Sequence, residues 1–125
     1  MEHNMNKKMV TVIEFPPFLS QVGKSIKPEE RDKLIDFLAR NPEAGEEITG
    51  TGGIRKLRWG GKGKGKRGGL RVIYYFYNET APVFLLTVYG KGEQENLTNE
   101  QKARMIDLTS RLKAECKAKR RKPHD

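Results

Sequence analysis

Four short segments of the chain are rich in β-branched and aromatic residues, the composition typical of β-strands. They cover residues 9–15, 54–59, 70–77 and 83–89. Pro16 and Pro17 directly follow the first segment and are expected to end it. The other three follow one another along the chain without a helical pattern between them, which predicts a three-stranded antiparallel meander.

Segment 70–77 is the strongest strand signal, yet it contains a charged residue, Arg71. Successive side chains of a strand point to opposite faces of its sheet. One face therefore receives the most apolar set, which is Val72, Tyr74 and Phe76. Arg71 is expected on the opposite face. That face also receives Ile73, Tyr75 and Tyr77.

A first helix is predicted from Pro28, because proline fits the first turn and the following Glu29 and Glu30 complement the helix dipole. Apolar residues at helical spacing follow, and Asn41-Pro42 ends the helix. Residues 18–23, which precede it, are consistent with one or two helical turns.

A last helix is predicted from Thr98, whose hydroxyl can cap the helix while Gln101 reaches back in a capping box. A stripe at helical spacing marks the face that packs or binds. Its members are Met105, Leu108, Thr109, Leu112 and Cys116. Cys116 is interpreted as a small buried hydrophobe rather than a nucleophile, because no cationic or histidine neighbour at fixed spacing would activate it.

A chain of 125 residues with 35% hydrophobic content can form one compact domain. We expect this domain to span residues 9–116. Residues 1–8 are then a flexible leader, and residues 117–125 a disordered basic tail.

Cysteine and histidine are scarce in this chain. The lone Cys116 cannot form an internal disulfide, and His3 and His124 lie at the chain ends. These residues offer no metal-ligand cluster of recognisable spacing, so we expect neither a metal nor another cofactor. No apolar run approaches the ~18 residues of a membrane span, and no secretion signal is recognisable. A reducing, cytoplasmic setting is expected.

The net charge of +9 is concentrated in two places. Residues 48–78 contain no acid and nine of the 13 glycines; their basic residues are Arg55, Lys56, Arg58, Lys62, Lys64, Lys66, Arg67 and Arg71. Residues 111–125 carry seven more basic residues against two acids. Clustered positive charge on an otherwise mildly acidic chain predicts a site for a polyanion, either nucleic acid or an acidic membrane face.

Two nucleotide-binding motifs match the glycine-rich stretch by letter only. Residues 60–67 match most of a P-loop, but Arg67 stands where a hydroxyl should bind Mg²⁺, and the loop leads into a strand instead of a helix. The Gly63, Gly65 and Gly68 pattern of a dinucleotide site fails because the same helix is missing. What remains is a loop whose glycines let the backbone approach phosphates while its lysines neutralise them.

Three stretches carry a family resemblance: GGIRKLR (52–58), KGKGKRGGLRVIYYF (62–76) and LLTVYGKGE (85–93). Over residues 9–115 the chain resembles the RelE/HigB family of bacterial toxins. The resemblance implies a small α+β domain of the RelE-like, microbial RNase-like kind. In this fold an N-terminal strand and helices pack on an antiparallel β-meander, and a C-terminal helix follows.

The resemblance also implies an activity and partners. It implies a metal-independent, ribosome-dependent endoribonuclease, an mRNA interferase, that cleaves mRNA in the A site of the small ribosomal subunit in contact with rRNA and so inhibits translation. The RNA's own 2′-hydroxyl would attack the adjacent phosphate. A cognate antitoxin, a helix-turn-helix DNA-binding protein, is implied as the neutralising partner.

The family's catalytic positions fall on Lys56, Arg58, Arg71 and Lys91. Arg71 is expected to clamp the transition state, Lys56 to accept a proton, and Arg58 with Lys91 to orient the RNA strand. Further RNA contacts are expected from the other basic residues of the stretch, which are Arg55, Lys62, Lys64, Lys66 and Arg67.

The chain departs from the family at two positions. Gly92 stands where some members have arginine, and the C-terminal tyrosine that some use as general base falls near Leu97 or Thr98. The proton relay therefore stays open between Tyr89, Glu93 and a loop lysine, although Tyr89 is more typical of a packing residue. Two other functions fit the same pattern: a ParE-like inhibitor of DNA gyrase and a non-catalytic nucleic-acid-binding module.

Overall fold

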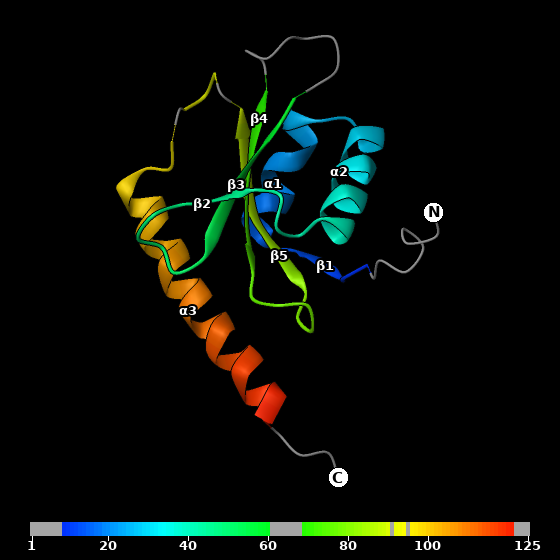
Figure 1. The fold of residues 1–125 in the computed structure, drawn as a ribbon. Helices are drawn as coiled ribbons and strands as arrows, with labels where there is room; N and C mark the ends of the chain where they lie inside the picture. Colours follow the sequence, from blue (N-terminus) through cyan, green and yellow to red (C-terminus); the bar gives the residue numbers. More distant parts are fainter. Residues whose placement is uncertain (1–8, 61–68, 91, 95, 122–125) are drawn as a thin grey trace.

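The structure is a computed structural model that describes residues 9–60, 69–90, 92–94 and 96–121. Figure 1 shows its helices and strands in chain order. They are β1 (Val12–Glu14), α1 (Pro16–Ser25), α2 (Pro28–Arg40), β2 (Glu46–Glu47), β3 (Ile54–Trp59), β4 (Leu70–Phe76), β5 (Val83–Gly90) and α3 (Asn99–Arg121). The expected leader, residues 1–8, lies outside the described residues.

The strands form one sheet in the order β1-β5-β4-β3-β2. β3, β4 and β5 pair antiparallel, which confirms the predicted meander, and β1 lies parallel to β5. β2 was not predicted, because glutamate has a low strand propensity. Its two residues pair with basic residues of β3, Glu46 with Lys56 and Glu47 with Arg55, and opposite charges across a strand pair stabilise the pairing.

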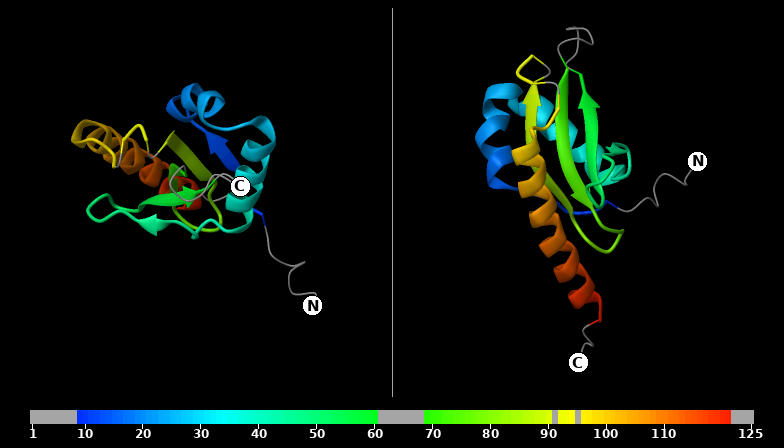
Figure 2. Two further views of the ribbon diagram at one scale, coloured as in Figure 1. Left: turned by 90° about the horizontal axis from the view of Figure 1, so that it is seen from above. Right: turned by 90° about the vertical axis from the view of Figure 1, so that its left-hand side faces the viewer.

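Helices cover both faces of the sheet. Figure 2 shows α1 and α2 on one side and α3 on the other. The first core lies under α1 and α2 and contains Phe18, Leu34, Val72 and Tyr74. The second core lies under α3 and contains Ile54, Ile73, Tyr75, Tyr89 and Met105. The predicted alternation of β4 is confirmed, because its odd- and even-numbered residues enter different cores.

The N-terminal boundaries differ from the prediction. β1 is shorter than residues 9–15, and α1 is longer than residues 18–23. Pro16 and Pro17 lie in the first turn of α1. The N–H groups of a first turn make no hydrogen bond within the helix, so proline loses nothing there, and its fixed φ suits the helix. α2 begins at Pro28, as predicted.

The capping box at the start of α3 is confirmed. The Thr98 hydroxyl accepts a hydrogen bond from the Gln101 N–H at 3.0 Å, and the Gln101 side chain accepts one from the Thr98 N–H at 2.9 Å. The predicted stripe faces the second core, where Leu108, Leu112 and Cys116 pack. Thr109, the polar member of that stripe, is buried.

Helix α3 continues through residues 117–121, which were predicted to be disordered. Lysine, arginine and alanine dominate this end; all three are good helix formers, and the positive side chains complement the negative C-terminal end of the helix dipole. Residues 122–125 of the predicted tail lie outside the described part of the chain.

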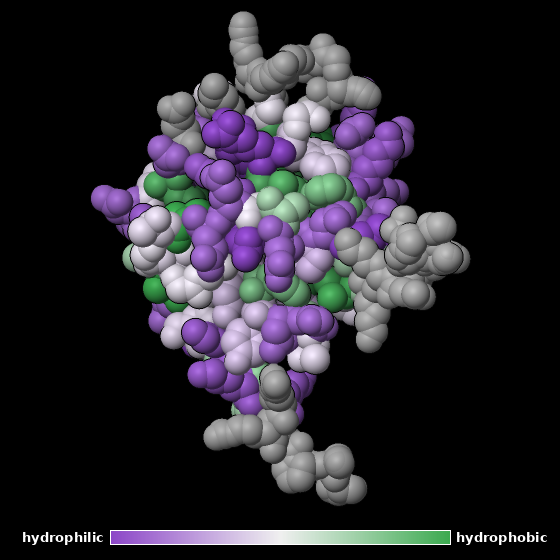
Figure 3. All heavy atoms as spheres, viewed as in Figure 1, coloured by the Kyte–Doolittle hydropathy of each residue, from purple (hydrophilic) through white to green (hydrophobic). Residues whose placement is uncertain are grey.

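The face of the molecule seen in Figure 3 is mainly hydrophilic. Charged and polar side chains cover most of the face seen in Figure 3, and hydrophobic residues show between them in small areas. Among the residues that the structure describes, no helix is both long enough and apolar enough to span a membrane.

We predict that Thr98→Ala lowers the free energy of unfolding by about 1 kcal/mol, because the cap hydrogen bond to the Gln101 N–H is lost. Urea denaturation of the purified protein measures this change. Ser110→Ala, at an exposed position within α3, is the control and should change the stability by less than about 0.5 kcal/mol. Equal stability of Thr98→Ala and the parent would show that the cap does not hold α3.

Candidate functional site

A row of side chains crosses three neighbouring strands near one end of the sheet. Arg58 of β3 lies directly opposite Arg71 of β4, and Arg71 lies directly opposite Tyr89 of β5. Residues directly opposite one another in paired strands share a face of the sheet. Because Tyr89 belongs to the core under α3, both arginines are on the α3 side.

Lys56 belongs to the next row on the same face, opposite Ile73 of the second core. The register thus brings together three of the four predicted catalytic residues, Lys56, Arg58 and Arg71. The row lies one residue inside the ends of β3 and β4, which are Trp59 and Leu70. The glycine-rich segment joins these two ends. Its predicted RNA-binding residues, Lys62, Lys64, Lys66 and Arg67, lie outside the described residues, as does Lys91.

Arg55 is placed apart from this group. It lies opposite Tyr74, on the α1 and α2 side of the sheet. Its guanidinium donates hydrogen bonds to the carbonyl oxygens of Glu43 at 3.2 Å and Gly45 at 2.6 Å. Arg55 therefore has a structural contact that ties the segment before β2 to β3. The sequence could have predicted this difference, because strand alternation places Arg55 on the opposite face from Lys56 and Arg58.

The three cations on the α3 side have weak partners. Within the described ranges no ion pair includes Lys56, Arg58 or Arg71. Arg71 Nη1 lies 3.5 Å from the Leu70 carbonyl oxygen, and Lys56 Nζ lies 3.4 Å from Asn96 Oδ1. The nearest acid by register is Glu46, opposite Lys56. Like charges opposite one another destabilise a strand pair, so the Arg58–Arg71 pair lowers the stability of the folded chain when no anion is bound.

Tyr89 completes the row as its uncharged member. The residue is 5% exposed, and within the described ranges its hydroxyl oxygen has no hydrogen-bond partner. Burial raises the pKa of Tyr89, and the positive charge of Arg71 opposes that rise. A buried hydroxyl without a partner costs about 1–3 kcal/mol. The sequence named Tyr89 as one candidate for the proton relay but favoured a packing role for it.

The segment between β5 and α3 runs past this row. Glu93 accepts a hydrogen bond from the Gly90 N–H at 2.9 Å, which holds a tight turn at the end of β5. Gln94 donates to the Gln101 side chain at 3.0 Å, so the segment is tied to the first turn of α3. Leu97 packs on the second core, and Thr98 caps the helix. The structure thus gives Glu93, Leu97 and Thr98 structural contacts.

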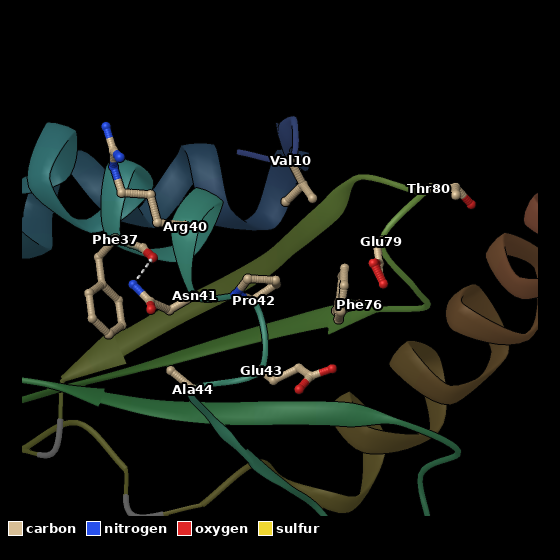
Figure 4. Close-up of a pocket in the computed structure, with 10 residues that line it drawn as sticks. All are labelled: Val10, Phe37, Arg40, Asn41, Pro42, Glu43, Ala44, Phe76, Glu79 and Thr80. Carbon is tan, nitrogen blue, oxygen red and sulfur yellow. Dashed lines mark hydrogen bonds between the residues drawn. The ribbon is translucent and has the colours of Figure 1, made fainter. Parts of the chain in front are cut away.

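The cavities differ in charge. A cavity of about 320 Å³ lies between β2 and β3 and is lined by Ala44, Glu46, Lys56, Leu57 and Arg58. A larger one, of about 620 Å³, lies beside the first core and includes none of the predicted site residues. Figure 4 shows its apolar residues Val10, Phe37 and Phe76 with the carboxylates of Glu43 and Glu79. The one cation among these lining residues, Arg40, is paired with Asp36, so the two carboxylates make this larger cavity a poor phosphate site.

Within the described ranges, no three His, Cys, Asp or Glu residues lie close enough to hold a metal ion. The chemistry available on the α3 side of the sheet is therefore that of guanidinium, ammonium and phenol groups. These groups donate hydrogen bonds and positive charge to a phosphate.

The fold and the row of cations place this chain in the class of small α+β domains with a cationic site at one end of an antiparallel meander. No protein-family model matches the chain. Among solved structures, the chain is similar to a double arginine-to-alanine mutant of the Escherichia coli toxin RelE in the free state. The TM-score is 0.50, the sequence identity is 18%, and the match covers 70% of this chain and 88% of that one. The chain thus has the RelE-like fold, which confirms the predicted fold class and the structural resemblance.

We predict a pH-dependent stability from the buried tyrosines. Burial, with smaller contributions from Cys116 and Tyr77, raises the pKa of Tyr75 to about 12, while an unfolded tyrosine titrates near pH 10. Between about pH 10 and pH 12 the folded chain binds more protons than the unfolded chain, so stability should fall as the pH rises. A titration of phenolate absorbance measures the pKa, and Tyr75→Phe should remove the step near pH 12. Ordinary titration of every tyrosine in the folded protein would contradict the assignment.

Proposed function

We propose that this chain is the toxin of a bacterial toxin–antitoxin module and acts in the cytoplasm as a ribosome-dependent endoribonuclease. The observation that carries the proposal is the row of Arg58 and Arg71, with Lys56 beside it, on one face of the sheet without an ion pair to a described carboxylate. A protein that keeps a repulsive cross-strand pair gains from it only when an anion binds there. The RelE-like fold supports the choice of RNA as that anion.

The proposed reaction needs positive charge and proton transfer. The 2′-hydroxyl of the RNA attacks the adjacent phosphorus, the bond from phosphorus to the 5′-oxygen breaks, and the products carry a 2′,3′-cyclic phosphate and a 5′-hydroxyl. The 2′-hydroxyl gives up one proton, and the leaving 5′-oxygen takes up one proton. Groups preorganised around the pentavalent phosphorus stabilise its developing charge without a metal.

Each residue of the site has a proposed role in this reaction. Arg71, the central member of the row, clamps the phosphorane with its planar guanidinium. Lys56 is the proposed acceptor of the 2′-hydroxyl proton, and Arg58 with Lys91 orients the strand. The basic residues of segment 60–69 hold the neighbouring phosphates, and we keep Lys62, Lys64, Lys66 and Arg67 as their proposed RNA contacts.

The proposed partners follow from the same assignment. The substrate is mRNA held in the A site of the small ribosomal subunit, where rRNA phosphates add to the negative charge that the basic residues meet. The neutralising partner is a cognate antitoxin. A short helix-turn-helix protein encoded beside this chain would support that assignment.

The function is tested on purified ribosomes that carry a defined mRNA. We predict cleavage on the ribosome, little cleavage of free RNA, and products with cyclic-phosphate and 5′-hydroxyl ends. An mRNA with a single 2′-deoxy nucleotide at the cleaved position is the matched control and should stay intact, because the nucleophile is missing. Cleavage of that control, or metal-dependent degradation of free RNA, would contradict the mechanism. Gyrase-linked DNA breaks without mRNA cleavage would identify a ParE-like inhibitor instead.

We predict that Arg71→Ala lowers single-turnover cleavage about 100- to 1000-fold, the effect of removing one preorganised donor to a developing oxyanion. Its thermal stability should stay the same or rise slightly, because a like-charge neighbour of Arg58 is removed. Arg40→Ala, which removes the same charge from exposed Arg40 at the end of α2, is the control and should cleave normally. Near-normal cleavage by Arg71→Ala would remove Arg71 from the site, and a large fall in melting temperature would make it a structural residue.

A further inference from the structure

The hydroxyl of Tyr89 is a feature of the cationic row that packing does not explain. Tyr89 is 95% buried, with 5% of its surface exposed, and its hydroxyl has no hydrogen-bond partner among the residues that the structure describes. Buried tyrosine hydroxyls usually find a hydrogen-bond partner. Phenylalanine would fill the same space in the core under α3 without burying an unpaired polar atom.

Tyr74, a core tyrosine on the other face of the sheet, is a useful comparison because its hydroxyl is fully hydrogen-bonded. Its hydroxyl accepts a hydrogen bond from the Gly45 N–H at 2.8 Å and donates one to the Pro42 carbonyl oxygen at 2.8 Å. Tyr74 therefore has a structural role that its hydroxyl performs. The Tyr89 hydroxyl has no such role in the free chain.

The position of Tyr89 indicates what kind of partner it lacks. Tyr89 lies directly opposite Arg71, which lies directly opposite Arg58, so a phenol and two guanidinium groups form one row across adjacent strands. Because burial raises the pKa of Tyr89, its hydroxyl keeps its proton at neutral pH and is a donor. Three donors in a row, two of them charged, match the oxygens of a phosphodiester.

We propose that Tyr89 is the uncharged member of the substrate-binding row and that its hydroxyl donates a hydrogen bond to an oxygen of the phosphodiester that Arg71 clamps. This inference rests on the proposed ribonuclease function and adds a substrate contact to it. The role is that of a neutral donor and not of a general base, because a proton acceptor would have to lose the proton that burial retains.

The hydroxyl oxygen is closed to solvent in the free chain, so the phosphate must displace a neighbour to reach it. Arg71 is suited to that movement. Its positive charge acts on Tyr89, and the contact of its guanidinium with the Leu70 carbonyl oxygen is long, at 3.5 Å. The proposal therefore requires Arg71 to turn toward the phosphate when the RNA binds.

The test compares Tyr89→Phe and Tyr74→Phe with the parent chain on ribosomes that carry a defined mRNA. We predict that Tyr89→Phe lowers single-turnover cleavage about 10- to 100-fold, the scale for losing a hydrogen bond to a charged acceptor. Its melting temperature should be unchanged or higher, since no hydrogen bond of the free chain is lost. Tyr74→Phe should show the reverse, with a lower melting temperature and normal cleavage per folded molecule.

The shape of the pH–rate profile separates a donor from a general base. Tyr89→Phe should lower the cleavage rate by the same factor at every pH, so that the pH–rate profile keeps its shape. Loss of the pH dependence on one side of the profile would assign proton transfer to Tyr89 and overturn the donor role. Normal cleavage by Tyr89→Phe, or a fall in its melting temperature as large as that of Tyr74→Phe, would make Tyr89 a packing residue. If the parent chain cleaves no mRNA, the proposed function itself fails, which is a separate result.

Discussion

The pairing register of β4 with its two neighbours is the constraint on which the site depends. β4 lies between β3 and β5, and its register places Arg71 between Arg58 and Tyr89. A shift of one residue would send every side chain of β4 to the opposite face of the sheet. Arg71 would then enter the core under α1 and α2, and Val72 would take its place in the row. The two hydrophobic cores oppose this shift, because each needs its own half of the β4 side chains.

The same row holds two unfavourable features. Two like charges lie opposite one another, and at the end of the row a buried hydroxyl has no partner among the described residues. Elsewhere Glu14 pairs with Arg31 and the Tyr74 hydroxyl bonds to two backbone groups, although the buried indole Nε1 of Trp59, at the end of β3, also has no partner within the described ranges. Local conflicts that the remainder of a fold tolerates are characteristic of functional sites. The charge of the row fits a phosphate, whereas the larger cavity beside the first core presents carboxylates.

Much of the fold was predictable from local patterns. The meander, the helix from Pro28 and the capping box of Thr98 and Gln101 depend on neighbours within a few residues, and all three are confirmed. The boundaries that failed depend on longer contacts or on weak propensities. β2 pairs with β3, with Glu46 opposite Lys56 and Glu47 opposite Arg55, and α3 continues into a lysine-rich segment that was expected to be disordered.

The sequence by itself determined that positive charge concentrates between Glu47 and Glu79 and that Arg71 faces away from the most apolar residues of its strand. It did so because strand alternation is a property of consecutive residues. Only the tertiary structure decided which cations share a site. It grouped Lys56, Arg58 and Arg71, assigned Arg55 to backbone carbonyls on the other face, and brought Tyr89 beside Arg71. Those neighbours come from strands distant in the chain, and their meeting depends on sheet register, which local sequence patterns do not contain.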